Sequence, residues 1–149
     1  MESKLDQIIF DEGNVDRLDA VCSFLKPFIE AKFLLPRTRD ELTRLLTHSF
    51  VALQDAEVVG FSALEIYSQK LAEIQCLAVS PTVQRRGVGR GLVHRCVEVA
   101  RQKNVKELMA ISASDGMFLA CGFDYSLPNQ KRALFISLQD DLESEDSQA

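Results

Sequence analysis

The chain has 149 residues, which is the usual size of one domain and enough to bury a hydrophobic core. Hydrophobic residues make up 46% and charged residues 26% of it, which excludes a mostly disordered or fibrous protein. Its apolar runs are far shorter than the roughly 20 residues that cross a bilayer, and its polar start lacks the apolar stretch of a secretory signal. We therefore expect a cytoplasmic protein without a membrane partner.

The net charge of −5 is concentrated at the C-terminal end. Residues 139–149 hold five acidic residues and no basic one, which leaves 17 residues of each sign in residues 1–138. We expect a folded domain over residues 1–138 and a disordered acidic tail over residues 139–149. A neutral domain argues against nucleic acid as a partner, because phosphate binding needs concentrated positive charge.

Hydrophobic periodicity predicts the element order β-α-α-β-β-β-α-β-α-β-β. This order predicts an α/β (α+β) fold in which a mixed sheet is flanked by helices. The predicted helices cover residues 15–29, residues 38–46 after a capping box at Thr38, residues 87–103 and Asp115–Cys121. The predicted strands are Leu5–Phe10, Phe50–Leu53, Val58–Ile66, Leu71–Val79 and Glu107–Ser112, followed by a closing pair, Tyr125–Leu127 and Ala133–Leu138.

The cysteines are widely spaced in apolar surroundings and form no Cys-x-x-Cys pair. Reduced, buried thiols are expected from this spacing rather than disulfides or zinc ligands, and we expect no metal. The four residues concerned are Cys22, Cys76, Cys96 and Cys121.

The strand Leu71–Val79 carries a carboxylate, Glu73, where a central strand of the sheet is expected. Partial burial would raise the pKa of this carboxyl group, which suits a general base beside a cleft. The alternatives are an exposed glutamate on an edge strand, or an ion pair with an arginine. Successive side chains of a strand point to opposite faces of the sheet. One face is therefore predicted to carry Leu71, Glu73, Gln75, Leu77 and Val79, and the other, apolar face is predicted to carry Ala72, Ile74, Cys76 and Ala78.

The segment Gln84–Gly91, with the sequence QRRGVGRG, joins this strand to the next helix. Glycines let backbone amides approach a ligand, and a helix N-terminus adds about half a positive charge. The segment therefore predicts an anion site suited to phosphate, to which the arginines add charge. It matches neither the P-loop nor the dinucleotide fingerprint, in which Leu92 would have to be glycine. The alternative is a glycine-rich helix start that binds no ligand.

Gln84–Gly89 resembles the Gln/Arg-x-x-Gly-x-Gly/Ala signature of the GCN5-related N-acetyltransferases. Glu73 precedes Gly87 by the offset at which histone-acetylating members carry their general base, and Cys121-Gly122-Phe123 follows downstream. The resemblance runs from about residue 5 to residue 138 and implies the fold of that family.

The resemblance also implies an acetyl-CoA-dependent N-acetyltransferase that moves the acetyl group directly to a primary amine in a ternary complex. Glu73 would then be the base, and the Leu77 amide would stabilise the developing oxyanion. Phe118 stands where most members carry the tyrosine that protonates the thiolate, so another acid or solvent must serve. Tyr125 is one candidate for that acid, and the alternative, which we favour, is a structural role for Tyr125. The implied cofactor-binding residues are Leu77, Ala78, Val79, Gln84, Arg85, Arg86, Gly87, Val88, Gly89, Arg90 and Phe118.

Residues 34–42, 70–79 and 118–131 resemble the acetyltransferase domain of the N-acetylglutamate synthases. This resemblance implies that Arg37 and Lys70 bind the carboxylates of glutamate or another small acidic amino acid. The alternative for each of these two residues is that it is only a solvated charge on the protein surface. Beyond residue 131 the sequence departs from the synthase pattern, since Phe135-Ile136 replaces a Tyr-Asn pair and residues 139–141 replace an Arg-x-Ser.

Three interpretations of the function remain open. The first is a small-molecule acetyltransferase acting on an anionic amine, for which a homodimer is one possible assembly. The second is a protein acetyltransferase that modifies lysine or the N-terminal amine. The third is a non-catalytic module that binds acetyl-CoA.

Overall fold

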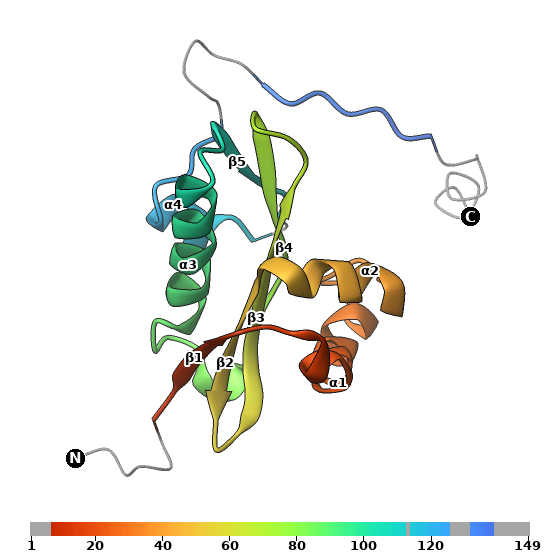
Figure 1. Cartoon of the computed structure of the whole chain (residues 1–149), viewed down its shortest axis with the longest axis vertical. Helices are drawn as coiled ribbons and strands as arrows, with labels where there is room; N and C mark the ends of the chain where they lie inside the picture. The colour runs from red at the N-terminus through yellow and green to blue at the C-terminus, as the bar shows by residue number, and fades with distance from the viewer. Residues whose placement is uncertain (1–6, 113, 126–131, 139–149) are drawn as a thin grey trace, which may run out of the picture.

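Alternating apolar stretches of the chain form one five-stranded mixed sheet with helices on both faces (Figure 1). The computed structural model describes residues 7–112, 114–125 and 132–138. The strand order is β1-β2-β3-β4-β5, in which β1 to β4 are antiparallel neighbours and β5 is parallel to β4. This confirms the predicted fold class. The strands are β1 (Ile9–Glu12), β2 (Ser49–Gln54), β3 (Glu57–Ile66), β4 (Leu71–Val79) and β5 (Glu107–Ala110).

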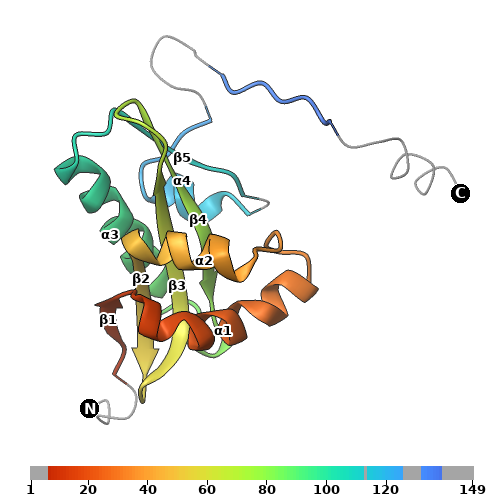
Figure 2. The ribbon, with the colours of Figure 1, turned by 45° about the vertical axis from the view of Figure 1, so that its right-hand side comes forward.

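Helices α1 (Leu18–Glu30) and α2 (Arg39–Leu45) lie across one face of the sheet, and α3 (Val88–Gln102) and α4 (Gly116–Ala120) lie on the other (Figure 2). Short 3-10 turns occupy Val15–Arg17, Leu46–His48 and Pro81–Val83. Helix α2 begins at the predicted capping box, in which the Thr38 hydroxyl accepts from the Glu41 amide and the Glu41 carboxylate accepts from the Thr38 amide. This cap fixes the approach of the chain to α2.

Each face of the sheet packs its own apolar cluster against the helices that cover it. The α1–α2 face buries Val21, Leu25, Leu42, Phe61 and Cys76, among others. The opposite face packs against α3 and α4, and one of the clusters between them buries Leu64, Ala72, Ile74, Val93, Cys96, Ala100 and Phe118. Burial of these side chains is the dominant favourable contribution to folding.

The predicted alternation of side chains along β4 is wrong beyond Gln75. On β3, Phe61 and Ala63 are two residues apart, whereas their β4 partners Ala78 and Gln75 are three apart, so β4 carries an extra residue. The extra residue forms a β-bulge at Cys76, whose φ is +58°. Because of it, Ala72 and Ile74 pack toward α3 while Cys76 and Ala78 pack toward α1 and α2.

The first strand starts later than predicted and includes two acidic residues. β1 covers Ile9–Glu12, where a strand over Leu5–Phe10 with a break at Asp11 is expected. β1 pairs with β2 along one side only and its side chains are largely exposed, so Asp11 and Glu12 are tolerated. Residues 1–6 lie outside the described residues.

The prediction of a closing strand over Ala133–Leu138 is wrong for the described residues. Residues 132–138 have no strand, and the blue segment in Figure 1 extends away from the sheet. The side chains of Leu134, Phe135, Ile136 and Leu138 are between 76% and 92% exposed. An alternating apolar pattern favours a strand, but a strand needs a hydrogen-bonding partner, and this segment has none among the described residues. Of the other predicted closing strand only Tyr125 is described, and the predicted tail over residues 139–149 lies outside the described residues.

The cysteines are free thiols, and the prediction that they are buried is confirmed for two of the four. Cys76 and Cys96 are buried, while Cys22 and Cys121 are half-buried. Within the described part of the chain, no helix is long and apolar enough to cross a membrane.

Candidate active site

Strands β4 and β5 are paired along only the first part of β4. The pairing stops at Ile74 and Ala110, whereas β4 continues to Val79. The later part of β4 therefore has no β5 partner among the described residues, which leaves one edge of its backbone available to a strand-like ligand. Leu77 and Ala78, which the sequence assigns to the cosubstrate, lie in this part.

The predicted phosphate loop has the backbone geometry of an anion site. Arg85 and Gly87 have positive φ angles of 65° and 80°, and Arg86 between them does not. When the sign of φ alternates between successive residues in this way, their backbone amides form a concave arrangement that binds anions. Gly87 is the N-cap of α3, and no described side chain caps the helix. A Cβ on Gly87 would meet nothing within 4 Å, so the space beside the loop is open.

Close packing places the first turn of α3 directly against the end of β4. A Cβ on Gly89 would lie 2.9 Å from the sulfur of Met117 in α4 and 3.5 Å from Val79. The N-terminus of α3 thus lies next to the unpaired end of β4, so a ligand held by the loop amides would lie beside that strand. The loop therefore fits the diphosphate of a coenzyme that continues along β4.

The predicted base Glu73 belongs to a cluster of polar side chains on the α1–α2 face of the sheet. The Tyr67 hydroxyl donates to Glu73 Oε1 at 2.6 Å, and Gln75 Nε2 donates to the Tyr67 hydroxyl at 3.2 Å. Gln75 Nε2 also donates to Glu65 Oε2. Arg37 Nη2 donates to Gln75 Oε1 at 3.1 Å. Burial and the neighbouring Glu73 carboxylate raise the pKa of Tyr67, so its hydroxyl remains protonated at neutral pH.

A cavity of about 300 Å³ lies beside this cluster, between α2 and strands β3 and β4. Its lining combines cations with carboxylates, since Arg37 and Arg44 line it together with Glu41 and Glu65. His48 also lines it, and burial together with the positive charge of Lys103 lowers the pKa of this imidazole. A cavity with charges of both signs suits a ligand that is itself a zwitterion.

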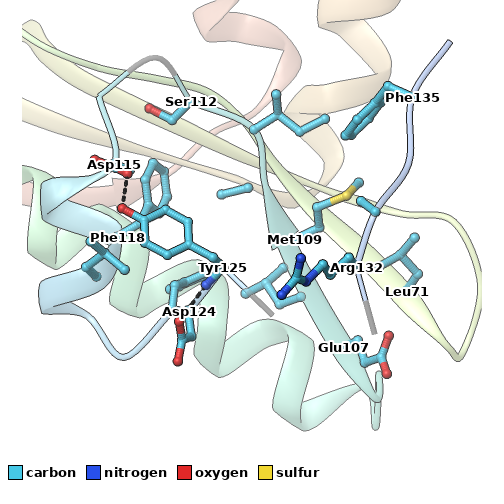
Figure 3. A pocket seen from close by; sticks show the side chains of 16 residues that line it. Leu71, Glu107, Met109, Ser112, Asp115, Phe118, Asp124, Tyr125, Arg132 and Phe135 are labelled. Carbon is cyan, nitrogen blue, oxygen red and sulfur yellow. Dashed lines mark hydrogen bonds between the residues drawn. The ribbon is translucent and has the colours of Figure 1, made fainter. Parts of the chain in front are cut away.

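A larger cavity of about 560 Å³ lies along β5 and α4, with Arg132, Ala133 and Phe135 on its other side. Of the described lining residues, Phe118 alone is predicted to bind the cosubstrate. Figure 3 shows Tyr125 beside Phe118 with its hydroxyl directed at Asp115, to which it donates a hydrogen bond. Phe118 is 8% exposed and its ring packs edge-on against Phe123 at 5.4 Å, so its side chain belongs to the hydrophobic core.

The structure brings together some of the predicted site residues and separates others. Arg37 and Glu73 are linked through Gln75 and Tyr67. Lys70 lies in the exposed turn before β4, and its amide donates to the Ser68 hydroxyl. It is not among the described residues that line the cavity containing Arg37, so its proposed role remains a prediction.

Sequence reasoning missed three polar residues of the cluster, Glu65, Tyr67 and Gln75. A signal for Gln75 was available, because it is an uncharged polar residue two positions after Glu73 in a strand that is otherwise apolar. The involvement of Glu65 and Tyr67 depends on the pairing of β3 with β4, which no local pattern specifies.

Known proteins resemble this chain in sequence. The model of the Acetyltransferase (GNAT) family matches residues 18–123. An uncharacterized N-acetyltransferase of Chlorobaculum tepidum is 31% identical over 90 residues, which cover 60% of this chain and 58% of that protein. An amino-acid acetyltransferase of Neisseria meningitidis serogroup A is 30% identical over 101 residues, 67% of this chain and 23% of that protein. The chain thus spans less than two thirds of either relative.

Solved structures resemble it as well. N-acetylglutamate synthase from Neisseria gonorrhoeae, complexed with coenzyme A and N-acetyl-glutamate, superposes with a TM-score of 0.68 at 26% identity over 80% of this chain and 28% of that chain. Rv2747 from Mycobacterium tuberculosis, in complex with CoA and NLQ, shares the fold with a TM-score of 0.73 at 23% identity over 80% of this chain and 75% of that chain. Since the family match extends from α1 to the end of α4 and includes both β4 and the loop before α3, the chain belongs to the GNAT family of acetyltransferases.

Proposed function

We propose that this protein transfers the acetyl group of acetyl-CoA to the amine of a small acidic amino acid, glutamate being the first candidate. The observation that carries the proposal is the position of Glu73. It lies one residue before the end of the pairing between β4 and β5, and hydrogen bonds through Tyr67 and Gln75 join it to Arg37, which lines the smaller cavity. Relatives named amino-acid acetyltransferase and a structural neighbour that binds N-acetyl-glutamate support this substrate class.

The cosubstrate is assigned to the open edge of β4 and to the loop before α3. Amides of Gln84–Gly89 hold the diphosphate, and the backbone of Leu77, Ala78 and Val79 pairs with the pantetheine arm as an added strand would. Arg85, Arg86 and Arg90 supply positive charge around the loop. Acetyl-CoA supplies the acetyl group as a thioester, which an amine can attack directly.

The acceptor is assigned to the cavity of about 300 Å³. Arg37 binds a carboxylate of the acceptor by charge-assisted hydrogen bonds, which are about twice as strong as neutral ones. Glu73 accepts the proton that the ammonium group must lose before its nitrogen can attack. The Leu77 amide stabilises the oxyanion as the new carbon–nitrogen bond forms and the carbon–sulfur bond breaks. As the intermediate collapses, the nitrogen releases its second proton to solvent. The leaving thiolate takes a proton from solvent, because a phenyl ring, Phe118, has none to give.

Release of free thiol from acetyl-CoA, measured with the purified chain and each amino acid in turn, tests this function. We expect turnover with glutamate or aspartate, and a product whose mass corresponds to the acetylated amino acid. Turnover with peptides alone would indicate a protein acetyltransferase. Tight binding of coenzyme A without turnover on any amine would indicate a non-catalytic module. Fractionation of cells tests the expected cytoplasmic location, and light scattering distinguishes a homodimer from other assemblies.

A further inference from the structure

The side chains between the cavity and the base form a hydrogen-bonded relay with one direction. The Arg37 guanidinium donates to the Gln75 carbonyl oxygen at 3.1 Å, the Gln75 amide nitrogen donates to the Tyr67 hydroxyl at 3.2 Å, and the Tyr67 hydroxyl donates to Glu73 at 2.6 Å. Each donor thus points toward the carboxylate. Because hydrogen bonds in such a chain polarise one another, the relay is more stable than its separate bonds.

The relay exists because of the pairing between β3 and β4. Glu65 and Glu73 are direct cross-strand partners, and like charges in that position repel each other. Gln75 donates to Glu65 and Tyr67 donates to Glu73, so each carboxylate receives a hydrogen bond from a neutral group. These bonds offset the repulsion and hold both carboxylates in place.

The two middle members differ from the groups at the ends of the relay. Tyr67 and Gln75 carry no charge, and neither is a cofactor-binding residue in the proposed function. Tyr67 lies in the turn after β3 and is 51% exposed. Gln75 is half-buried, immediately before the bulge at Cys76. The core of the protein would keep its packing without the Tyr67 hydroxyl.

We propose that Tyr67 and Gln75 are positioning residues that couple Arg37, the cation assigned to the acceptor's carboxylate, to Glu73, the base. This inference rests on the proposed function for the roles of Arg37 and Glu73. Tyr67 fixes Glu73 Oε1, which leaves Oε2 to take the proton of the acceptor's amine. Gln75 holds Tyr67 and Arg37 at the distances that this requires.

The decisive variant is Tyr67→Phe, which removes one hydroxyl and keeps the ring. Loss of a donor to a carboxylate disfavours its charged form. We therefore expect the side-chain carboxyl of Glu73, observed by carbon-13 NMR, to titrate at higher pH than in the wild type. The substitution leaves the neighbouring charged groups unchanged, namely Glu65, which is the cross-strand partner of Glu73, and Arg37 and Glu41, which line the adjoining cavity. Tyr125→Phe is the matched control, because Tyr125 also donates to a carboxylate, that of Asp115, and it should leave the Glu73 titration unchanged.

Kinetics provide the second measurement. With the acceptor found for the wild type, Tyr67→Phe should lower kcat by roughly 10-fold or more, as expected for a lost hydrogen bond to a charged group. It should leave KM for the acceptor near its wild-type value and move the acidic limb of the pH–rate profile to higher pH. Gln75→Leu should lower kcat and also raise KM, because it releases both Tyr67 and Arg37.

The outcomes separate the relay from the proposed function. If Glu73 titrates identically in the wild type and Tyr67→Phe, the relay is wrong, whatever the activity of the protein. If the wild type acetylates an amino acid but Tyr67→Phe keeps its kcat and pH profile, the proposed function stands and the positioning role is wrong. If the titration shifts but the wild type acetylates no amine, the relay stands and the proposed function is wrong.

Discussion

Glu65 on β3 and Glu73 on β4 are directly opposed in the antiparallel pair at the centre of the sheet. Two carboxylates in this position repel each other unless other groups stabilise them. Here the stabilising groups are Gln75 and Tyr67, and Gln75 is in turn bonded to Arg37. Two carboxylates, two neutral donors and the cation of Arg37 thus lie beside one cavity.

Glu73→Gln should abolish most of the acetyl transfer. A general base contributes typically about 10²- to 10⁴-fold to a rate, so a loss of that order is expected. The loss should be greatest below the pKa of the acceptor's amine, where little of the amine is already deprotonated. Glu57→Gln is the control, because Glu57 is exposed at the start of the same sheet's β3. A pH–rate profile of Glu73→Gln that matches the wild type would remove Glu73 from the mechanism.

Gly87→Asp should eliminate binding of coenzyme A. The substitution puts a side chain into the open space beside the loop amides, adds a negative charge there and strains a residue with φ of 80°. Gly122→Asp is the matched control, since Gly122 also has a positive φ, 96°, and open space around its Cβ position. Calorimetric titration with coenzyme A should detect binding to Gly122→Asp and none to Gly87→Asp. Equal affinities for the two variants would overturn the phosphate-loop assignment.

Arg37→Ala should raise KM for the acidic acceptor and leave the affinity for coenzyme A unchanged. A hydrogen bond to a charged group contributes about 1.5–3 kcal/mol, so KM should rise roughly 10- to 150-fold. Arg39→Ala is the control, because Arg39 pairs with Asp19 on α1 and is exposed. Should both variants change KM equally, the assignment of the carboxylate site to Arg37 would be incorrect.

Acidification should destabilise the fold partly through His48. Burial and Lys103 lower the pKa of His48 below its ordinary value near ~6.5, so the unfolded chain binds its proton at a higher pH than the folded chain. Stability is therefore lost as the pH falls from about 6.5 through the folded pKa. His48→Gln should reduce this loss, measured as the free energy of unfolding in urea at about pH 7.5 and about pH 5.5. The control is His94→Gln, at an exposed position on α3, which should lose as much unfolding free energy as the wild type. An identical pH dependence in the wild type and both variants would contradict the role of His48.

The structure confirms most of what local patterns predict along the chain. β4 has the predicted bounds, Leu71–Val79, because it is a long, mostly apolar stretch that is bounded by turns. α2 starts at the capping box at Thr38, since that cap is formed by residues three positions apart. The prediction of a strand over Ala133–Leu138 is wrong because a strand also depends on a partner that its own sequence does not contain.

Residues that are neighbours in the chain were enough to predict the order of strands and helices, the loop before α3 and the glutamate on β4. The direction in which the β4 side chains point and the groups that they meet follow from the folded structure. The bulge at Cys76 results from the pairing of β4 with β3. The contact between Arg37 and Gln75 joins residues 38 positions apart. Such contacts depend on how separate elements pack against one another, which hydrophobic periodicity and local motifs do not specify.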